Sequence, residues 1–449
     1  MGLGQSGLAA AHFLAQQGAQ VIVNDQKTKE ELMPVIQSLT EFQIKYELGE
    51  NQLDTLENVD LIVVSPGIPL HHPFLKKATS QGIPLTNEME IALTMIQKPV
   101  IAITGTNGKS TTASLIAEIL RAAGNSVFLG GNIGNPLLNY LIEKKDCDWI
   151  VAEISSFQLE LIHSLVPAVA VITNVASDHL EHHLNLEAYI EAKRRMVKFC
   201  HQDSYLVLNY DDPVVRGFRN ETQAKVMGFM HFSQKNFVER FPLDFYGACI
   251  TDQTREILLQ IKGEKEVYSL KGFQFLGAHN RENFAAALCA VRAMGVSPEV
   301  IQSLVKTLHP IPHRLEFVRR KNQVYFFNDS KSTNIHSLRK SLESFSSHSM
   351  ILIAGGKDKN EDFSELVELV KKKCKMLILI GEAKERMNRA LGDYVETYLV
   401  GGFKEAVYLA YQKSRNQDII LLSPGCSSYD MFKNFEERGQ YFKELVAQL

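Results

Sequence analysis

The chain has 449 residues, of which 45% are hydrophobic and 22% are charged, and this composition excludes a disordered, fibrous or membrane-embedded protein. Its length exceeds what one hydrophobic core usually supports, so we expect about three domains. The formal net charge of -3 gives no support for nucleic acid or an anionic membrane surface as a partner.

The cysteines and the chain start bear on the cellular compartment. Six cysteines are scattered without a C-x-x-C pair, which argues against a zinc site and against a disulfide framework. No apolar run is long enough to span a bilayer, and the start MGLGQSGLAAAHF lacks the basic segment of a signal peptide. We therefore expect a cytoplasmic protein that does not insert into membranes.

Three stretches alternate apolar strand-like runs with helical patterns, which predicts an α/β fold of parallel sheets covered by helices. The predicted domains are residues 1–95, 96–309 and 310–449. We expect Rossmann-like domains at both ends and a central sheet of the phosphate-binding-loop ATPase type. Residues 230–270 show a weaker pattern, which indicates irregular or antiparallel structure. Two prolines in HPIPHR, residues 309–314, mark the last boundary.

The first domain opens with a glycine turn. Gly2-x-Gly4-x-x-Gly7 is followed by Asp25 at the end of the predicted strand VIVND, a spacing typical of dinucleotide-binding turns. A UDP-type ligand, a redox cofactor such as NAD(P) and a purely structural turn remain open interpretations. No strand precedes Gly2, so we expect either that the start is truncated or that this sheet lacks its first strand.

The sequence TGTNGKST, residues 104–111, lies between the apolar run VIAIT and a helical pattern. In this context, glycines let backbone N–H groups close around phosphate oxygens, and the start of the helix favours negative charge. Lys109 adds positive charge, and Ser110 or Thr111 can hold Mg²⁺. The segment predicts ATP as a ligand, and a chance Gly-Lys turn is the alternative.

Two further strand-like runs end in side chains that can ligate metals. Glu153 ends DWIVAE, and Asp178 and His179 follow AVAVITNVAS. The ends of parallel strands meet at the ligand-binding edge of an open sheet. Glu153 could bind a metal through oxygen and His179 through nitrogen, with Asp178 orienting the imidazole; a strand-end cap is the alternative. For His182 and His183 we expect a solvated loop.

Later lysines and an aspartate complete the candidates. Lys193 lies in the amphipathic helical pattern LEAYIEAKRRMV, where a surface lysine is the simplest expectation, as it is for Arg195. Asp329 and Lys331 follow the strand-like run VYFFN, where they could reach a nucleotide or an anionic substrate. Asp329 could instead belong to a helix N-cap.

Together these motifs resemble the muramyl ligase family along nearly the whole chain. TGTNGKST resembles its ATP loop, GNIG at 131–134 its substrate loop, and EISSFQLE at 153–160 its metal-carboxylate strand. SDHLEHH followed by AYIEAKRRM resembles its histidine and lysine segment. The motifs GAHNRENFAAA, HRLE, NDSKSTN and SPGCSSYDMFKNFEERG complete the set in the family's order.

The resemblance implies roles for residues of this chain. The implied ATP-binding residues are Gly105, Thr106, Asn107, Gly108, Lys109, Ser110, Thr111, Asn280, Asn283, Arg314 and Asp329. The implied residues for a UDP-linked substrate are Gly4, Gln5, Ser6, Asp25, Ser65, Gly67, Asn132 and Gln158. The implied residues for D-glutamate are Lys331, Thr333, Lys359 (Lys357 if the alignment slips), Ser428 and Phe435. Two Mg²⁺ ions are expected on Ser110, Glu153, His179 and a carbamylated Lys193, and the implied catalytic residues are Lys109, His179 and Lys193.

The resemblance also implies an activity. The forms SSFQLE and DMFKNFEERG are similar to those of members that add D-glutamate to UDP-N-acetylmuramoyl-L-alanine through an acyl phosphate, in peptidoglycan precursor synthesis. The expected partners are small-molecule substrates, and the expected state is a monomer. The alternatives are a member that adds L-alanine or is of the folylpolyglutamate type, an NAD(P)-dependent oxidoreductase, and a nucleotide-binding scaffold without turnover.

Overall fold

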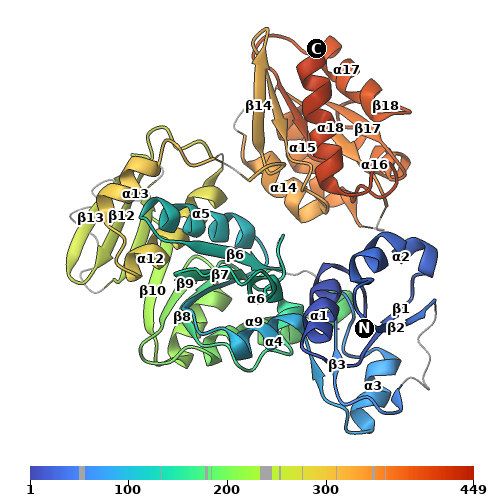
Figure 1. Cartoon of the computed structure of the whole chain (residues 1–449). Coiled ribbons are helices and arrows are strands. Elements are labelled where there is room, and N and C mark those ends of the chain that lie inside the picture. Colours follow the sequence, from blue (N-terminus) through green and yellow to red (C-terminus); the bar gives the residue numbers. More distant parts are fainter. Residues whose placement is uncertain are drawn as a thin grey trace. The chain divides into compact units, whose positions relative to one another are not determined.

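The fold is α/β, as predicted (Figure 1). The computed structural model describes the chain apart from residues 50–55, 133, 177–179, 184, 233–244, 252–253, 276, 310, 346–348 and 359–360. It divides into two compact units. Unit 1 comprises Met1–Gly272 and Glu282–Lys306, and unit 2 comprises Phe273–Arg281 and Thr307–Leu449. Among the described residues, no helix has the length and apolar character needed to cross a membrane.

Unit 1 begins with two pairs of parallel strands and four α-helices. These elements are α1 (Gln5–Gln16), β1 (Val21–Asp25), α2 (Lys29–Ile36), η1 (Gln37–Leu39), β2 (Ile44–Leu48), β3 (Ile62–Val63), α3 (Pro73–Ser80), β4 (Leu85–Thr86) and α4 (Glu88–Met95). Strand β1 pairs with β2, and β3 pairs with β4. The Met1 nitrogen donates to Val63 O (2.8 Å), and Gly2 N–H donates to Asn24 O (2.8 Å). The first residues therefore connect the two pairs of strands.

A nine-stranded sheet forms the rest of unit 1. Its strands are β5 (Val100–Thr104), β6 (Val127–Gly131), β7 (Trp149–Glu153), β8 (Pro167–Ile172), β9 (Tyr205–Asn209), β10 (Lys225–His231), β11 (Gly247–Thr251), β12 (Glu256–Ile261) and β13 (Glu264–Ser269). Their order is β13-β12-β11-β10-β9-β8-β5-β7-β6; in the described residues, β11–β12 and β12–β13 pair antiparallel and the other neighbours pair in parallel. The antiparallel structure predicted within residues 230–270 is confirmed for β11–β12 and β12–β13, whereas β10 and β11 pair in parallel.

Helices accompany this sheet because its central strands are apolar on both faces. All five residues of β5 are buried, as expected for a parallel strand covered on both sides. The helical elements are α5 (Lys109–Ala122), α6 (Leu138–Glu143), α7 (Ser156–Leu159), α8 (Leu180–His183), α9 (Leu186–Lys198), α10 (Pro213–Gly217), η3 (Phe218–Glu221), α12 (Ala278–Ala293) and α13 (Pro298–Leu304). Helix α12 contains the passage from unit 2 back into unit 1.

Unit 2 is built on a six-stranded sheet. Its strands are β14 (Glu316–Lys321), β15 (Val324–Asn328), β16 (Met350–Gly355), β17 (Cys374–Ile380), β18 (Glu396–Leu399) and β19 (Ile419–Leu422), in the order β14-β15-β19-β16-β17-β18. Among the described strands of this sheet, β14 pairs antiparallel with β15 and the others pair in parallel. The helices are α14 (Ile335–Glu343), η4 (Phe363–Leu366), α15 (Val367–Lys373), α16 (Lys384–Leu391), α17 (Phe403–Lys413) and α18 (Phe435–Gln448).

Residues of β16 show why both faces of this sheet need helices. Leu352 and Ala354 belong to one buried cluster, whereas Ile351 and Ile353 belong to another. Successive strand residues point to opposite faces, so the continuous apolar run MILIA supplies two cores. The parallel strands predicted from the runs VYFFN, MILIAGG, MLILIG and DIILLSPG are confirmed.

Candidate functional site

The predicted phosphate-binding loop, residues 104–111, connects β5 to α5. Its glycines Gly105 and Gly108 have φ angles of 145° and 85°, which L side chains rarely adopt. A Cβ atom would lie 2.0 Å from Thr173 Oγ1 at Gly105, and 2.2 Å from Asn283 Oδ1 at Gly108. Both positions therefore need glycine, for backbone conformation and for space. The result is a tight turn into a helix N-terminus, the arrangement that binds phosphate in many proteins.

Residues after β8 hold this loop in place. Thr106 N–H donates to Asn174 O (2.9 Å), and Asn107 N–H donates to Asn174 Oδ1 (2.9 Å). The Thr173 hydroxyl donates to Asn107 O (2.6 Å). The sequence analysis did not identify Thr173 or Asn174 as site residues, although their position directly after a buried strand could have indicated that they lie at the site.

Two lysines converge on one carbonyl of the loop. Lys109 Nζ donates to Gly105 O and to Thr106 O, each at 2.9 Å. Lys193 Nζ donates to Gly105 O at 2.9 Å and lies 4.4 Å from the centre of the Tyr189 ring. The structure therefore places the Lys193 ammonium against the loop.

The expectation of a surface lysine at position 193 is wrong, since Lys193 is only 1% exposed. Arg195 is also not simply solvent-facing, because its Nε donates to Leu159 O (2.7 Å) and its Nη2 donates to Ile162 O (2.6 Å). Both errors have one cause: the long stems of these side chains lie against the protein while their charged groups find backbone carbonyls.

A buried carboxylate lies at the end of β7. Glu153 is 2% exposed, and its Oε1 accepts from Asn132 Nδ2 at 2.8 Å. Asn132 N–H also donates to Glu153 O (2.8 Å). Glu153 Oε2 is buried and has no hydrogen-bond partner among the described residues. A carboxylate oxygen of this kind suits a bound cation, because a buried polar atom without a partner is costly.

The predicted Asp178 and His179 lie outside the described residues. The expectation of a solvated loop at His182 and His183 is wrong, because both belong to α8 and their side chains are 8% and 0% exposed. His182 Nε2 lies 3.1 Å from Glu160 Oε2, and His183 Nδ1 lies 3.3 Å from Glu160 Oε1.

This group of Glu160, His182 and His183 has the composition of a metal site. Burial works against ionisation of Glu160, but hydrogen bonds from the two imidazoles outweigh it and lower the pKa of Glu160 to about 2. His183 Nε2 also lies 2.9 Å from Ser156 Oγ. Contacts between the carboxylate and both rings therefore account for the group without an ion.

The candidate residues for a UDP-linked substrate lie around the start of unit 1. A cavity of about 300 Å³ is lined by Met1, Gly2, Asn24, Asp25, Gln26, Gly67, Ile68, Pro69 and His72. Asp25 Oδ2 accepts from Leu3 N–H (2.6 Å), and its Oδ1 accepts from Lys27 N–H (2.9 Å). Of the predicted residues, Asp25 and Gly67 line this cavity.

The other residues predicted for this substrate are placed differently. Gly4 precedes α1, whose first residues are Gln5 and Ser6, and the Ser65 hydroxyl donates to Gly2 O (3.0 Å). Gln158 is buried and completes the N-terminal cap of α7, where its Oε1 accepts from the N–H and hydroxyl of Ser155, each at 2.9 Å. These substrate assignments remain predictions.

Unit 2 carries a second buried carboxylate, at the end of β15. Asp329 Oδ1 accepts from Leu315 N–H (3.1 Å), and its Oδ2 accepts from the hydroxyls of Ser423 (2.8 Å) and Ser341. Burial raises the pKa of Asp329 to about 6, although the two hydroxyls act in the opposite direction. The alternative of a helix cap is wrong, because Asn334 caps α14.

Other predicted nucleotide residues lie on either side of the unit boundary. Asn280 and Asn283 are buried on α12, and Thr112 Oγ1 donates to Asn283 Oδ1 (3.5 Å) within unit 1. Arg314 is half-buried, and its positive charge favours the ionised form of Asp329. The adenine and ribose contacts remain predictions.

The predicted D-glutamate residues of unit 2 lie on segments after the strands. Lys331 and Thr333 follow β15, Ser428 follows β19, and Phe435 begins α18. Lys331 Nζ lies 5.5 Å from the centre of the Phe435 ring. Ser428 is buried.

Lys359 lies outside the described residues. The alternative residue, Lys357, pairs with Glu382 at 2.6 Å in an exposed ion pair. Its backbone N–H donates to Ser427 O (2.9 Å). The structure therefore ties the segment after β16 to the segment after β19.

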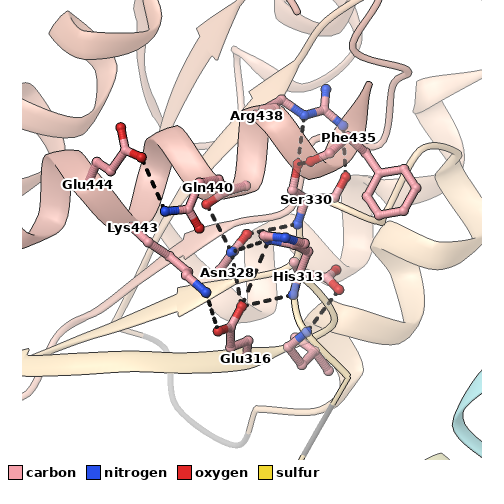
Figure 2. A network of polar contacts seen from close by, with 12 residues as sticks. His313, Glu316, Asn328, Ser330, Phe435, Arg438, Gln440, Lys443 and Glu444 are labelled. Atoms are coloured by element: carbon pink, nitrogen blue, oxygen red, sulfur yellow. Dashed lines mark hydrogen bonds and ion pairs between the residues drawn. The ribbon is translucent and has the colours of Figure 1, made fainter. Parts of the chain in front are cut away.

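A polar network supports the segment that carries Arg314 (Figure 2). His313 N–H donates to Glu316 Oε2 (2.8 Å), and Asn328 Nδ2 lies 2.9 Å from His313 Nδ1. Lys443 Nζ donates to Glu316 Oε1 (2.9 Å). Burial lowers the pKa of His313, although Glu316 opposes this. Sequence analysis missed these residues, because their partners are far apart along the chain.

The fold and the site are those of an α/β protein with a glycine-rich loop between a buried strand and a helix, and with buried carboxylates at strand ends. Three family domains match the chain: the Mur ligase MurD-like N-terminal domain over residues 1–87, the Mur ligase middle domain over 103–291, and the Mur ligase glutamate ligase domain over 313–426.

Curated relatives align along the whole chain. The chain is 43% identical over 448 residues to the UDP-N-acetylmuramoylalanine--D-glutamate ligase of Bdellovibrio bacteriovorus, covering 100% of this chain and 96% of that relative. It is 41% identical over 449 residues to the enzyme of the same name from Geotalea uraniireducens, covering 100% and 96%. This chain therefore belongs to the Mur ligase family.

Solved structures share the fold. A pseudomurein peptide ligase type C from Methanothermus fervidus has a TM-score of 0.60 at 20% identity and covers 99% of this chain and 98% of its own. The MurF ligase from Thermotoga maritima in complex with ADP has a TM-score of 0.62 at 16% identity and covers 98% and 99%. Identities this low support the fold alone.

Proposed function

We propose that this chain joins D-glutamate to UDP-N-acetylmuramoyl-L-alanine, with ATP converted to ADP and phosphate, as a step of peptidoglycan precursor synthesis. The Mur ligase family consists of ATP-dependent amide-bond ligases, and this chain is a member of it. The observation that carries the choice of acceptor is the full-length identity of 43% and 41% to two relatives named for D-glutamate. The glycine loop at β5 supports the use of ATP.

The reaction proceeds in two displacements. The alanyl carboxylate oxygen attacks the γ-phosphorus of ATP, ADP leaves, and an acyl phosphate forms. The D-glutamate amine then attacks the acyl carbon, phosphate leaves, and the nitrogen releases one proton. Phosphoryl transfer depends mainly on positioning and on positive charge over the phosphate oxygens. In our proposal, Lys109 and the loop's helix N-terminus supply that charge.

Glu153, together with Ser110 and His179, would hold two Mg²⁺ ions in this proposal. The unpartnered, buried Glu153 Oε2 fits this role, and Ser110 is buried in the first turn of α5. Bound Mg²⁺ would neutralise the negative charge of the triphosphate. Asn132 keeps the Glu153 carboxylate oriented through its 2.8 Å hydrogen bond.

Lys193 is proposed to carry a carbamate. The Lys193 ammonium would first lose one proton; the resulting amine nitrogen would then bond to the carbon of CO₂ and lose a second proton. A buried cation is thereby replaced by a carboxylate suited to Mg²⁺. The burial of Lys193 beside the phosphate-binding loop supports this assignment. Activity that falls when CO₂ is removed from the buffer, and recovers with bicarbonate, would support it; unchanged activity would contradict it.

We assign three functional parts to the chain in the same proposal. Residues 1–95 bind the UDP-sugar, 96–309 bind ATP, and 310–449 contact the amino acid and the nucleotide. We propose that the enzyme acts as a monomer in the cytoplasm, where its six free cysteines suit a reducing environment.

Phosphate release with ATP, UDP-N-acetylmuramoyl-L-alanine and a panel of single amino acids tests the proposed function. We expect release to require D-glutamate and the product to gain one glutamyl residue in mass. The variant Lys109→Ala should lose about 100-fold or more in rate with an unchanged melting temperature, because a phosphate-loop lysine contributes charge rather than packing.

The control is Lys198→Ala, since Lys198 is 62% exposed and lies outside the proposed site; it should keep the wild-type rate. A preference for L-alanine or another acceptor would contradict the assigned substrate. Near-normal phosphate release by Lys109→Ala would contradict the role of the loop.

A further inference from the structure

Arg438 is a fully buried arginine on α18, with 0% of its surface exposed. Its Nε donates to Ser330 Oγ (2.9 Å), and its Nη2 donates to Ser330 O (2.8 Å) and Cys426 O (3.1 Å). Its Nη1 donates to Ser427 O (3.3 Å). Figure 2 shows this guanidinium beside Ser330. One planar group therefore joins the segment after β15 to the segment after β19.

These two segments carry the residues that we assigned to D-glutamate. Ser330 precedes Lys331, and Cys426 and Ser427 precede Ser428. The Ser330 hydroxyl also donates to Phe435 O (2.8 Å). Lys331, Ser428 and Phe435 therefore each adjoin, or are themselves, a group that is fixed directly by Arg438 or through Ser330.

The charge of Arg438 is not paired within the described part of the chain. All four of its hydrogen bonds end on a hydroxyl or on backbone carbonyls, and no carboxylate of a described residue lies within ion-pair distance. Burial lowers the pKa of Arg438 to about 10, with Cys426, Asp430 and Asp329 opposing this. The guanidinium thus stays positive at neutral pH. A buried, uncompensated cation attracts anions strongly.

We propose that Arg438 is the positioning residue of the acceptor site: its guanidinium fixes the two acceptor segments to each other and supplies the positive charge that favours an amino acid with two carboxylates. This rests on the proposed function. Arginine suits the task because its planar group reaches several carbonyls in fixed directions, which a lysine ammonium cannot reproduce. The same helix packs closely against the segment before β14, since a Cβ at Gly439 would lie 2.2 Å from His313 Nδ1.

Steady-state kinetics of Arg438→Lys and Arg438→Gln test the proposal. We expect the KM for D-glutamate to rise at least about tenfold in both variants, since hydrogen bonds to charged groups contribute that much. The rise should be larger for glutamine, which also removes the charge. The KM for the UDP-linked substrate should change by less than about threefold, because no residue that we assigned to that substrate contacts Arg438.

Ser330→Ala keeps the test decisive if the arginine variants fail to fold. It removes one acceptor of Arg438 and the donor to Phe435 O while leaving the guanidinium in place, and a several-fold rise in the KM for D-glutamate is expected. Arg319→Gln is the matched control, because Arg319 donates to Val446 O (3.1 Å) and Ala447 O (3.2 Å) at the other end of α18. It should leave the KM for D-glutamate unchanged.

A lower kcat with an unchanged KM for D-glutamate in all three test variants would overturn the inference, since that pattern reports fewer folded molecules. The inference is equally overturned if Arg319→Gln raises this KM as much as the test variants do. The wild-type chain distinguishes this outcome from a failure of the proposed function. If the proposed function is wrong, the wild-type chain makes no product with D-glutamate.

Discussion

Asp329 has a carboxyl group that is buried among two hydroxyls and one N–H. Burial raises its pKa from 3.8 to about 6, so the folded chain binds more protons than the unfolded chain between these values. The resulting stability is present below about pH 4 and is lost as the pH rises through about 6. A shift of this size corresponds to about 3 kcal/mol at most.

Asp329→Asn should remove this pH dependence. The melting temperature of the wild type relative to the variant is expected to fall between pH 4 and pH 7, when both are followed by calorimetry. Asp362 should show the opposite dependence of stability on pH, because hydrogen bonds from Ser364 lower the pKa of its carboxyl group. The variant Asp362→Asn should therefore be less stable than the wild type above about pH 4. If the difference in melting temperature between the wild type and Asp329→Asn stays constant with pH, burial does not raise the pKa of Asp329.

Among the elements, helix α5 and the loop before it require glycines at both ends. Gly108 has a φ of 85° and its Cβ would meet Asn283 Oδ1, whereas Gly124, just beyond the helix, has a φ of 88° and open space around it. Alanine at either position should cost about 1 kcal/mol from the left-handed backbone alone. Gly108→Ala should cost more and should also raise the KM for ATP.

Melting temperatures and ATP kinetics of Gly108→Ala and Gly124→Ala measure this difference. The second variant isolates backbone strain, so the excess effect in the first reports the contact with Asn283. Equal stability and equal KM for ATP in the two variants would show that Asn283 can move aside at no cost. That result would also weaken the assignment of Asn283 to the nucleotide.

At the scale of the whole molecule, the reactivity of the cysteine thiols shows whether both units stay folded. Burial raises the pKa of Cys200, Cys249, Cys374 and Cys426 to about 12 each, and only the thiolate reacts with alkylating reagents. At pH 8 we expect these thiols to react with iodoacetamide about 1000-fold more slowly in the folded chain than in denaturant. Rapid labelling of Cys249 and Cys374 without denaturant, read by mass spectrometry, would mean that the cores of the two units open readily.

The α/β class, the main parallel strands and the phosphate-binding loop could all be predicted from the amino-acid sequence. These features are local: an apolar run long enough for a buried strand, or a glycine turn between a strand and a helix, needs only neighbours along the chain. Asp25, Glu153 and Asp329 were found for the same reason, because each lies at the end of a recognisable strand. The family resemblance rested on such local motifs as well.

The surroundings of these residues depend on how distant segments pack in the folded chain. His182 and His183 were expected in a solvated loop, and the helical pattern alone favoured a surface position for Lys193. Their partners, Glu160 and Gly105, come from other elements. The apolar run LIVVSPG at 61–67 forms a strand only at Ile62–Val63, since the turn in which Ile68 N–H donates to Ser65 O (3.0 Å) follows closely. The sequence assigned no individual role to Arg438, which is one of several charged residues in the motif DMFKNFEERG. Its role depends on carbonyls brought together from two strand ends, and burial of a charge beside distant backbone is a property of the folded chain alone.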